Sequence, residues 1–256
     1  MVLTIDGGRI RHRKNKRGKR KEGLKRCSYD SSWIEPKLFV IYTLNEKGEP
    51  QKVFSPIVDG TIGVKAFMEL LKSYISTLKI QDAEEVVLCA DGAPWIWERT
   101  VKLLHEVGVS PEKLFEVIDY THAKQNLHEV YDKLSKKHRQ EVSISQWKNF
   151  LWEGRIEDIL SEIKKVCKRS KHKALSKFES YFVKNKHRMK YKKNTESKRP
   201  CGSGVVESAI RRVINLRLKS CGTFWKEEKL EIMLYLRAQL LYGRWDNLYR
   251  NCLKVS

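Results

Sequence analysis

The sequence predicts an α/β fold with one mixed sheet, whose first three strands are antiparallel and whose later strands are parallel, and with an all-helical insertion before the last helices. Two observations predict this fold. Short apolar runs rich in β-branched residues come first along the chain, and helix-like and strand-like segments then alternate. The chain has 256 residues, of which 41% are hydrophobic, so it can bury a sizeable core and is not expected to be disordered.

Three early apolar runs predict the antiparallel part of the sheet. The first ends at Asp6, which is followed by two glycines, so it reads as a strand that stops in a turn. The basic tract that follows, up to Arg26, is expected to form a loop. The segment 45–49 joins the second and third runs, and its Asn and Gly suit a hairpin turn. The three predicted strands are residues 2–5, 37–43 and 51–58.

A regular alternation of helix and strand follows these runs. Apolar residues at helical spacing predict the helices, and short buried-looking runs that end at an aspartate predict the strands. Strand and helix alternating at these lengths indicate parallel strands joined by crossover helices. The predicted strands are 85–90 and 114–118, and the predicted helices are 64–78, 94–106 and about 122–138.

The rest of the chain is expected to be helical. Residues 139–199 show no strand pattern and form a predicted all-helical insertion, with helical spacing at 156–167 and 174–183. Helices at 205–219 and 227–242 follow, and the second closes the chain before Gly243. We therefore expect three consecutive parts: the first part of the core (1–138), the helical insertion with a basic tract (139–199), and the C-terminal helices of the core (200–256).

Three antiparallel strands followed by alternating helices and parallel strands is the order of the ribonuclease H fold. In this fold an acid at the end of the first strand faces an acid at the end of the fourth, and Asp6 and Asp91 occupy these two places. Oxygen ligands suit Mg²⁺ or Mn²⁺, and two such ions about 4 Å apart promote phosphodiester chemistry. For either residue alone, the alternative is an aspartate that caps a turn after a strand.

Glu207 is the candidate for a third carboxylate. On a helical wheel it lies at the seam between a polar arc and an apolar arc, where a buried helix could still present a carboxylate at the edge of the sheet. The alternative is an ordinary glutamate in the first turn, favoured by the helix dipole and paired with Arg211 four residues later. The apolar arc consists of Val205, Val206, Ala209, Ile210, Val213, Ile214 and Leu216.

The charge of the chain indicates a polyanionic partner. Lys and Arg number 52 against 31 Asp and Glu, a formal net charge of +21. Residues 9–26 carry eleven basic residues against one acid, and residues 184–199 carry eight against one. Neither tract has the apolar face of a lipid-binding helix, so nucleic acid is favoured over an anionic membrane. The alternative is that the tracts are solvated tails.

Several basic and aromatic residues near the candidate carboxylates are expected to contact DNA. Guanidinium groups can clamp phosphates and aromatic rings can stack on unpaired bases. For Trp95 and Trp97 a place in the core is favoured over base stacking. The candidate DNA-binding residues are Arg9, Arg11, Arg13, Arg211, Arg212, Arg217 and Lys219.

Other sequence features exclude several classes of protein. No apolar stretch approaches the roughly 20 residues that span a bilayer, and the N-terminus lacks a signal peptide, so a cytoplasmic protein without a membrane partner is expected. The six cysteines are too far apart for CxxC zinc or redox motifs, and we expect them to be reduced and structural.

Five strings carry a family resemblance: LTIDGGRIR, WIEPKLFVIY, CADGAPWIWE, VIDYTHAKQNL and CGSGVVESAIRRVINLRLKSCGTFW. In order and spacing they resemble the catalytic core of bacterial insertion-sequence transposases of the Asp-Asp-Glu type, the Kra-type group and its relatives. The resemblance extends to about Asp246. It implies that Asp6, Asp91 and Glu207 are a metal-binding triad for cleaving and joining DNA strands.

The resemblance also covers an Asp-x-x-His pattern, which Asp119 and His122 match. The pair is expected to orient the metal site or a DNA phosphate. The alternative is a helix N-cap aspartate with a surface histidine.

Transposases of this kind carry an end-binding region before the catalytic core, and here Met1 lies five residues before Asp6. We therefore expect a truncated core, or one that relies on an end-binding partner protein. Synapsis of two DNA ends favours a homo-oligomer. A DNA-binding protein in the cytoplasm is expected to associate with the nucleoid. Two alternatives remain open: a structure-directed nuclease that has lost strand transfer, and a non-catalytic DNA-binding or regulatory derivative.

Overall fold

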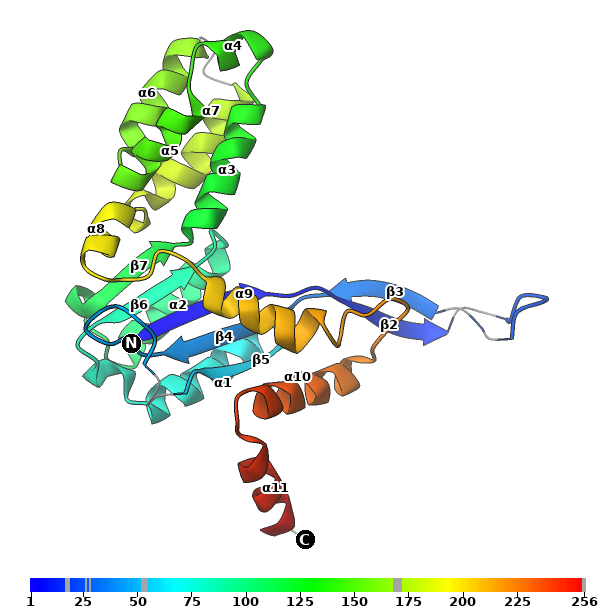
Figure 1. Ribbon diagram of the computed structural model, residues 1–256. Helices are drawn as coiled ribbons and strands as arrows, with labels where there is room; N and C mark the ends of the chain where they lie inside the picture. Colours follow the sequence, from blue (N-terminus) through cyan, green and yellow to red (C-terminus); the bar gives the residue numbers. More distant parts are fainter. Residues whose placement is uncertain (17–18, 26, 28, 52–54, 168–171, 255–256) are drawn as a thin grey trace. The chain divides into compact units, whose positions relative to one another are not determined.

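The computed structural model describes residues 1–16, 19–25, 27, 29–51, 55–167 and 172–254 (Figure 1). Its main sheet has five strands in the order β5-β4-β1-β6-β7. The mixture of antiparallel and parallel pairs in this sheet confirms the predicted ribonuclease H-like α/β fold. The strands are β1 (Val2–Gly7), β4 (Pro36–Tyr42), β5 (Ile57–Ile62), β6 (Val86–Ala90) and β7 (Leu114–Ile118).

One side of the sheet is antiparallel. The Gly8 N–H donates to the Pro36 carbonyl at 2.9 Å, and the Thr4 hydroxyl donates to the Val40 carbonyl at 3.4 Å. Residue numbers thus rise along β1 as they fall along β4, which is the antiparallel sense. β4 also pairs antiparallel with β5.

The other side of the sheet is parallel. Met1 donates from its amino group to the Glu85 carbonyl at 2.6 Å, and its own carbonyl accepts from the Val87 N–H at 2.9 Å. One residue bonded to both neighbours of the residue opposite is the parallel pattern. β6 and β7 are likewise parallel, with Ala90 beside Ile118.

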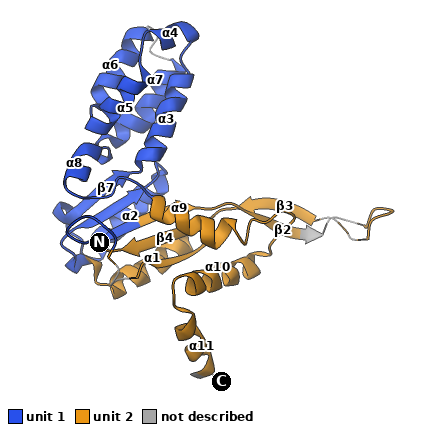
Figure 2. Ribbon diagram, in the orientation of Figure 1, with its two compact units in different colours: residues 1–3, 44–50, 81–203 blue, residues 4–43, 51–80, 204–256 orange. Residues whose placement is uncertain are grey.

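The chain forms two compact units, shown in Figure 2, and each is described by itself below. Unit 1 comprises residues 1–3, 44–50 and 81–203. Unit 2 comprises residues 4–43, 51–80 and 204–256. The first residues of β1 thus belong to unit 1 and the rest of the strand to unit 2.

Unit 1 contains β6, β7 and the helical insertion. Pro94 begins α2 (Pro94–Glu106), where its fixed φ suits the first helical turn. The predicted helix over 122–138 is two helices, because the Ser135 hydroxyl accepts a hydrogen bond from the His138 N–H at 3.2 Å and so starts a new one. The helices from here to the end of the insertion are α3 (Tyr120–Asp132), α4 (Lys136–Gln140), α5 (Ile144–Glu153), α6 (Ile156–Val166), α7 (Lys173–Phe178) and α8 (Tyr191–Glu196).

Unit 2 contains β4, β5, α1 (Val64–Thr77) and the C-terminal helices, α9 (Gly204–Ile210), α10 (Glu227–Leu241) and α11 (Trp245–Lys254). α9 continues into a π-helical segment, Arg211–Asn215. The wider π turn shifts the phase of the buried face, so Leu216, predicted on the apolar arc, is 56% exposed and Leu218 is fully buried. The prediction that the chain closes before Gly243 is wrong, because α11 follows.

The basic tract after β1 was expected to form a loop, but part of it forms a strand. β2 (Ile10–Lys16) pairs antiparallel with β3 (Tyr29–Ile34) in a two-stranded ribbon, with Arg11 opposite Trp33. Residues 17, 18 and 26 of the tract lie outside the described residues.

The third predicted strand, 51–58, is displaced along the chain. β5 begins only at Ile57, and residues 52–54 of the prediction lie outside the described residues. The turn before it is tight, as predicted: the Asn45 N–H donates to the Glu49 carbonyl, and the Gln51 N–H donates to the Thr43 carbonyl, both at 2.9 Å.

Two further expectations concern helices and thiols. Within the described ranges, no helix combines the length and the apolar character needed to cross a membrane. All six cysteines are free thiols, of which Cys89 and Cys167 are buried.

Candidate functional site

In unit 1, acidic residues gather at the carboxyl ends of β6 and β7. Ala90 and Ile118 are partners in the parallel register, and the Asp119 N–H donates to the Ala90 carbonyl at 2.8 Å. Asp91 and Asp119 directly follow these partners. The two aspartates therefore lie next to each other at one edge of the sheet.

Asp119 is only 1% exposed, and the protein itself satisfies both of its carboxylate oxygens. Oδ1 accepts from the His122 N–H at 2.7 Å and lies 3.4 Å from His122 Nδ1. Oδ2 accepts from the Ser203 N–H at 2.5 Å and from the Ser203 hydroxyl at 2.9 Å. The carboxylate thus ties the end of β7 to the start of α3 and to the loop that precedes α9.

These hydrogen bonds keep Asp119 ionised. Burial alone would raise its pKa, but the hydrogen bonds from His122 and Ser203 outweigh burial and hold the pKa of Asp119 well below its usual value. The position is therefore a fixed negative charge that orients its neighbours. It is also the N-cap of α3, so the helix-cap alternative considered from the sequence describes its backbone role correctly.

Asp91 is half-buried in a tight turn after β6. Its Oδ1 accepts from the Ala93 N–H at 2.9 Å, and its backbone carbonyl accepts from the Trp97 indole N–H at 2.9 Å. Trp97 is 5% exposed, so the expectation that it belongs to the core is confirmed. The turn fixes the backbone of Asp91 at the edge of the sheet.

Tyr181 lies against this turn. A Cβ atom at Gly92 would lie 2.2 Å from the Tyr181 ring, so only glycine fits there. Burial raises the pKa of Tyr181, and the negative charges of Asp91 and Asp119 raise it further. The Tyr181 hydroxyl therefore stays protonated and neutral, and it lies close enough to both carboxylates for their charges to raise its pKa.

A cavity opens beside Asp91 in unit 1. Three of its residues, Lys177, Lys184 and Arg188, are cationic, and Arg188 stacks over Trp97 at 4.4 Å while its Nε donates to Glu116 at 2.6 Å. Cationic groups of this kind suit a phosphate, although Lys177 also pairs with Glu129 and Glu98 lines the same cavity. The cavity is lined by Gly92, Pro94, Trp97, Glu98, Asn126, Lys177, Ser180, Tyr181, Lys184, Asn185 and Arg188.

The basic tract 184–199 is folded, which excludes the alternative of a solvated tail for this segment. Arg199 binds Glu85 through two hydrogen bonds of 2.9 and 2.5 Å, and Lys186 binds Glu157 at 2.9 Å. Some of the basic residues that were expected to bind a polyanion therefore form ion pairs within unit 1 instead.

In unit 2, the end of β1 packs against the helix that carries Glu207. A Cβ atom at Gly8 would lie 2.4 Å from Ile214 Cδ1, so Gly8 allows close packing against the π-helical continuation of α9. Asp6 is half-buried on β1, and its Oδ1 accepts from the Gly7 N–H at 2.7 Å. Glu207 is exposed in the first turn of α9.

The β2–β3 ribbon of unit 2 carries a ladder of arginines and aromatic rings. Arg9 and Arg11 lie over Trp33, at 5.5 and 5.3 Å from the ring centre, and Arg13 lies over Tyr29 at 4.9 Å. Trp33 is 48% exposed, so its ring remains open to a ligand. We call Arg9, Arg11, Arg13, Tyr29 and Trp33 the arginine ladder.

The segment after α9 adds to the arginine ladder. The Arg13 N–H donates to the Trp225 carbonyl at 2.9 Å, which joins this segment to β2. Lys219 lines one small cavity together with Arg11 and Trp33. The structure therefore brings four predicted DNA-binding residues together: Arg9, Arg11, Arg13 and Lys219.

The other predicted DNA-binding arginines have different surroundings. Arg212 donates to the Tyr242 hydroxyl at 3.2 Å and lies over its ring. Burial lowers the pKa of the Arg237 guanidinium, and the charge of the nearby Arg217 lowers it further. Arg211 is exposed. These three residues are not part of the arginine ladder.

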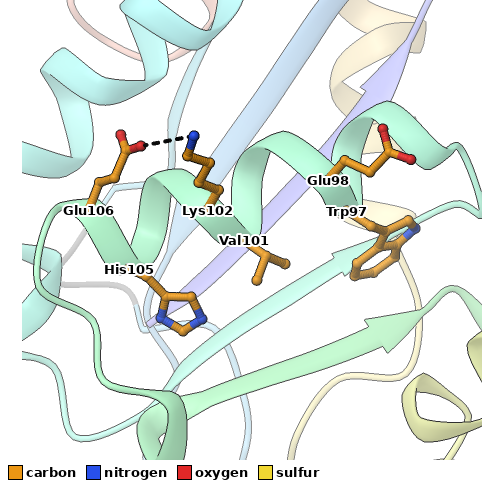
Figure 3. A pocket seen from close by; sticks show the side chains of 6 residues that line it. All are labelled: Trp97, Glu98, Val101, Lys102, His105 and Glu106. Atoms are coloured by element: carbon orange, nitrogen blue, oxygen red, sulfur yellow. Dashed lines mark ion pairs between the residues drawn. The ribbon is translucent and has the colours of Figure 1, made fainter.

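A second hollow runs along α2, and Figure 3 shows the side chains that line it. Its polar contact is a 3.9 Å ion pair between Lys102 and Glu106. All six lining residues come from this one helix. Because a binding site needs polar groups that converge from several elements, we do not assign a function to this hollow.

Groups of the types that bind metal ions are present in both units. Asp119 and His122 in unit 1 and Glu207 in unit 2 offer carboxylate and imidazole atoms. Asp91 and Asp6 add carboxylates at strand ends. Such oxygen-rich donors fit a hard divalent cation.

Sequence reasoning missed several residues of these surfaces. Ser203 contacts Asp119, and Tyr181 lies near Asp91 and Asp119, because the fold brings together residues that are far apart in the sequence. No local sequence pattern indicates these contacts. Glu35 stands so near Gly7 that a Cβ atom there would lie 2.6 Å from Oε1. Trp33 begins one of the five quoted strings, but no local pattern indicates its pairing with Arg11 across the ribbon.

Comparisons with known proteins give little further information. No family model and no curated protein matches the chain. Among solved structures the chain is similar to the Drosophila P element transposase strand transfer complex, with 12% identity and a TM-score of 0.26. The similarity covers 98% of this chain and 65% of the other, so the chain spans about two thirds of that protein's length.

Proposed function

We propose that this chain is the catalytic core of a DNA transposase, a metal-dependent enzyme that cleaves and joins DNA strands. Asp6, Asp91 and Glu207 are its catalytic carboxylates in this proposal. The finer assignment, to insertion-sequence transposases of the Asp-Asp-Glu type and the Kra-type group, is carried by the five strings of the sequence resemblance. Nucleoid association is part of the same proposal.

The observation that carries the proposal is the parallel pairing of β1 and β6. Met1 bonds to both Glu85 and Val87 and so stands opposite Val86. If this register continues along β1, Asp6 is level with Asp91. Two carboxylates at one sheet edge repel each other unless a cation lies between them.

The third carboxylate of the proposal is Glu207. The close packing of Gly8 against Ile214 joins the end of β1 to the helix of Glu207, which is the arrangement that a carboxylate near Asp6 requires. The exposed position of Glu207 leaves it accessible to a ligand. We therefore propose that Mg²⁺ or Mn²⁺ is held by Asp6, Asp91 and Glu207.

The remaining residues position the site and its substrate. Asp119 stays ionised and fixes the His122 side chain beside the end of β7, where both groups orient what binds at Asp91. The cationic cavity beside Asp91 holds a phosphate of the strand to be cut. The bound ion supplies activation of the attacking oxygen and stabilisation of the leaving oxygen.

The arginine ladder is the proposed DNA-binding surface. Stacking against Trp33 and Tyr29 holds the guanidinium groups extended, which lowers the entropy lost when they bind phosphates. Phosphate contacts carry no base information, so binding is mainly electrostatic. Because synapsis brings two DNA ends together, at least two copies of the chain act as a homo-oligomer.

The enzymatic proposal is tested with the wild-type chain. Supercoiled plasmid is incubated with Mg²⁺, with Mn²⁺ or with EDTA, and a labelled pre-cut 3′ end is offered to a second plasmid. Metal-dependent nicking together with joining supports the transposase. Nicking without joining would favour a nuclease, and binding without either reaction would favour a non-catalytic derivative.

A matched pair of variants excludes a contaminating nuclease. Asp91→Asn removes one proposed metal ligand and is expected to abolish nicking. Asp82→Asn makes the same change at an exposed aspartate of unit 1 and is expected to nick normally. Equal nicking by both variants would contradict the role of Asp91.

The DNA-binding proposal has its own test. Arg11→Gln removes one phosphate contact and is expected to reduce the slope of log affinity against log salt by about 0.9. Arg155→Gln carries the same charge change at an arginine that is paired with Glu153 and Asp158, and should leave the slope unchanged. An unchanged slope in Arg11→Gln would remove the arginine ladder from the interface.

A further inference from the structure

A second group of metal-binding side chains lies in the helical insertion of unit 1. One ligand atom each from His138, Cys167 and His172 lies within 4.8 Å of the other two. We propose that these three residues form a metal site of their own, which takes Zn²⁺ or a similar soft divalent ion. The proposal is independent of the DNA-cleaving function.

A short helix and two helix ends bring the residues together. His138 lies in α4, Cys167 is the C-cap of α6, and His172 is the N-cap of α7. Figure 1 places α4 at the end of the helical insertion that is farther from β6 and β7. An ion held by all three residues would therefore link three helices, of which α4 has no buried residue of its own.

The donor set determines which metal fits. One thiolate and two imidazoles suit Zn²⁺, whose bonds to sulfur and nitrogen are about 2.0 to 2.3 Å long. Tetrahedral ligands at these bond lengths lie somewhat closer together than 4.8 Å, so rotation of side chains would close the site. Mg²⁺ prefers oxygen ligands and is excluded from this group.

The state of each ligand is compatible with an ion. His138 Nδ1 is buried and has no hydrogen-bond partner among the described residues, as expected for an atom that awaits a ligand. The Cys167 side chain is buried, with the residue only 4% exposed. His172 Nδ1 accepts a long 3.2 Å hydrogen bond from the Ala174 N–H, which coordination through either ring nitrogen would replace.

The surrounding cavity offers a candidate for the fourth ligand, Glu141, although its carboxylate is outside the group of three atoms that lie within 4.8 Å of one another. Glu141 lines the same cavity as the three residues and follows His138 by three positions, so both lie on one helical face. A thiolate and a carboxylate together would neutralise the two charges of Zn²⁺. Lys137 and Lys165 also line the cavity, and their positive charges oppose any cation, so binding there depends on the bonds to the thiolate and the imidazoles.

The test uses Co²⁺ as a spectroscopic probe for the full-length protein. Tetrahedral Co²⁺ bound to a thiolate shows intense visible bands and a sulfur-to-metal charge-transfer band. We expect one equivalent to produce these bands in the wild-type protein, and Zn²⁺ to displace them and to raise the melting temperature. Absence of the bands at stoichiometric Co²⁺ would overturn the proposal.

Variants assign the bands to the site. Cys167→Ser should remove the charge-transfer band and weaken metal binding by more than the roughly 10- to 100-fold that changes around a metal ligand cause. Cys221→Ser, at an exposed cysteine, is the matched control and should keep the bands. Bands that persist in Cys167→Ser would refute the assignment.

A second variant guards against misfolding. His172→Asn removes the imidazole but keeps a side chain that is a preferred helix N-cap. We expect it to retain the wild-type circular dichroism and melting temperature without metal, and to lose the increase in melting temperature on adding Zn²⁺. A normal increase with Zn²⁺ would exclude His172 as a ligand.

Discussion

Replacing Asp119 with asparagine tests the buried carboxylate that links β7, α3 and the loop before α9. Asparagine has the same shape but only one acceptor oxygen. Its NH₂ group, itself a donor, must therefore face the donors of either His122 or Ser203. If it faces Ser203, two hydrogen bonds to a charged acceptor are lost, of 2.5 and 2.9 Å. Bonds to charged groups contribute about 1.5 to 3 kcal/mol each, so the variant should lose about 3 to 6 kcal/mol.

The pH dependence of this loss has a definite sign. The pKa of Asp119 in the folded protein lies well below that of an ordinary aspartate, about 3.9. Its stabilising contribution is therefore complete above the unfolded pKa and is lost as pH falls through the folded pKa. Asparagine does not titrate. Between about pH 8 and pH 2 the part of the stability difference that Asp119 causes should therefore shrink as pH falls below about 4.

The assay is thermal unfolding followed by circular dichroism across this pH range. For a chain of this size about 1 kcal/mol corresponds to roughly 2 to 4 °C, so Asp119→Asn should lower the melting temperature by at least about 6 °C. Ser203→Ala, which removes only the hydroxyl donor, should cost less. A loss below about 1 kcal/mol, or a difference that persists unchanged at low pH, would refute this reasoning.

Two further predictions concern glycines at close contacts. Gly8→Ala should cost about 1 to 3 kcal/mol by overpacking against Ile214 Cδ1, and Ile214→Val, which deletes that atom, should restore much of the loss in a double variant. Additive destabilisation, measured by urea unfolding, would contradict the contact. Gly92→Ala should lower the melting temperature because its Cβ would meet the Tyr181 ring; a melting temperature equal to the wild type would show that the ring does not lie there.

Where a segment has one buried face, the sequence predicted its structure closely. The limits of α2 and β7 agree with those expected, because Pro94 begins the helix and Asp119 ends the strand. The lack of a buried face likewise explains why β2 was not predicted from the sequence. Its partner strand β3 has no buried residue, and the ribbon places arginines against aromatic rings, so no alternation of apolar and polar residues marks it.

The candidate site was predictable only in part. Asp91 and Asp119 could be placed at strand ends because each follows an apolar run that ends abruptly. The burial of Asp119 by Ser203 joins residues 84 positions apart, and no local pattern encodes such a contact. The π-helical turn also defeats a helical wheel, since it moves Leu216 out of the apolar face that regular helical spacing assigns to it.

The most direct test of the central claim is to measure nicking and DNA binding side by side for Glu207→Gln. The change removes one negative charge but keeps the size of the side chain, and it does not touch the arginine ladder. Glu228→Gln, at another exposed first-turn glutamate, is the matched control. We predict that only Glu207→Gln loses Mn²⁺-dependent nicking while both variants bind labelled duplex as the wild type does; nicking by Glu207→Gln equal to that of the control would contradict the proposed metal site.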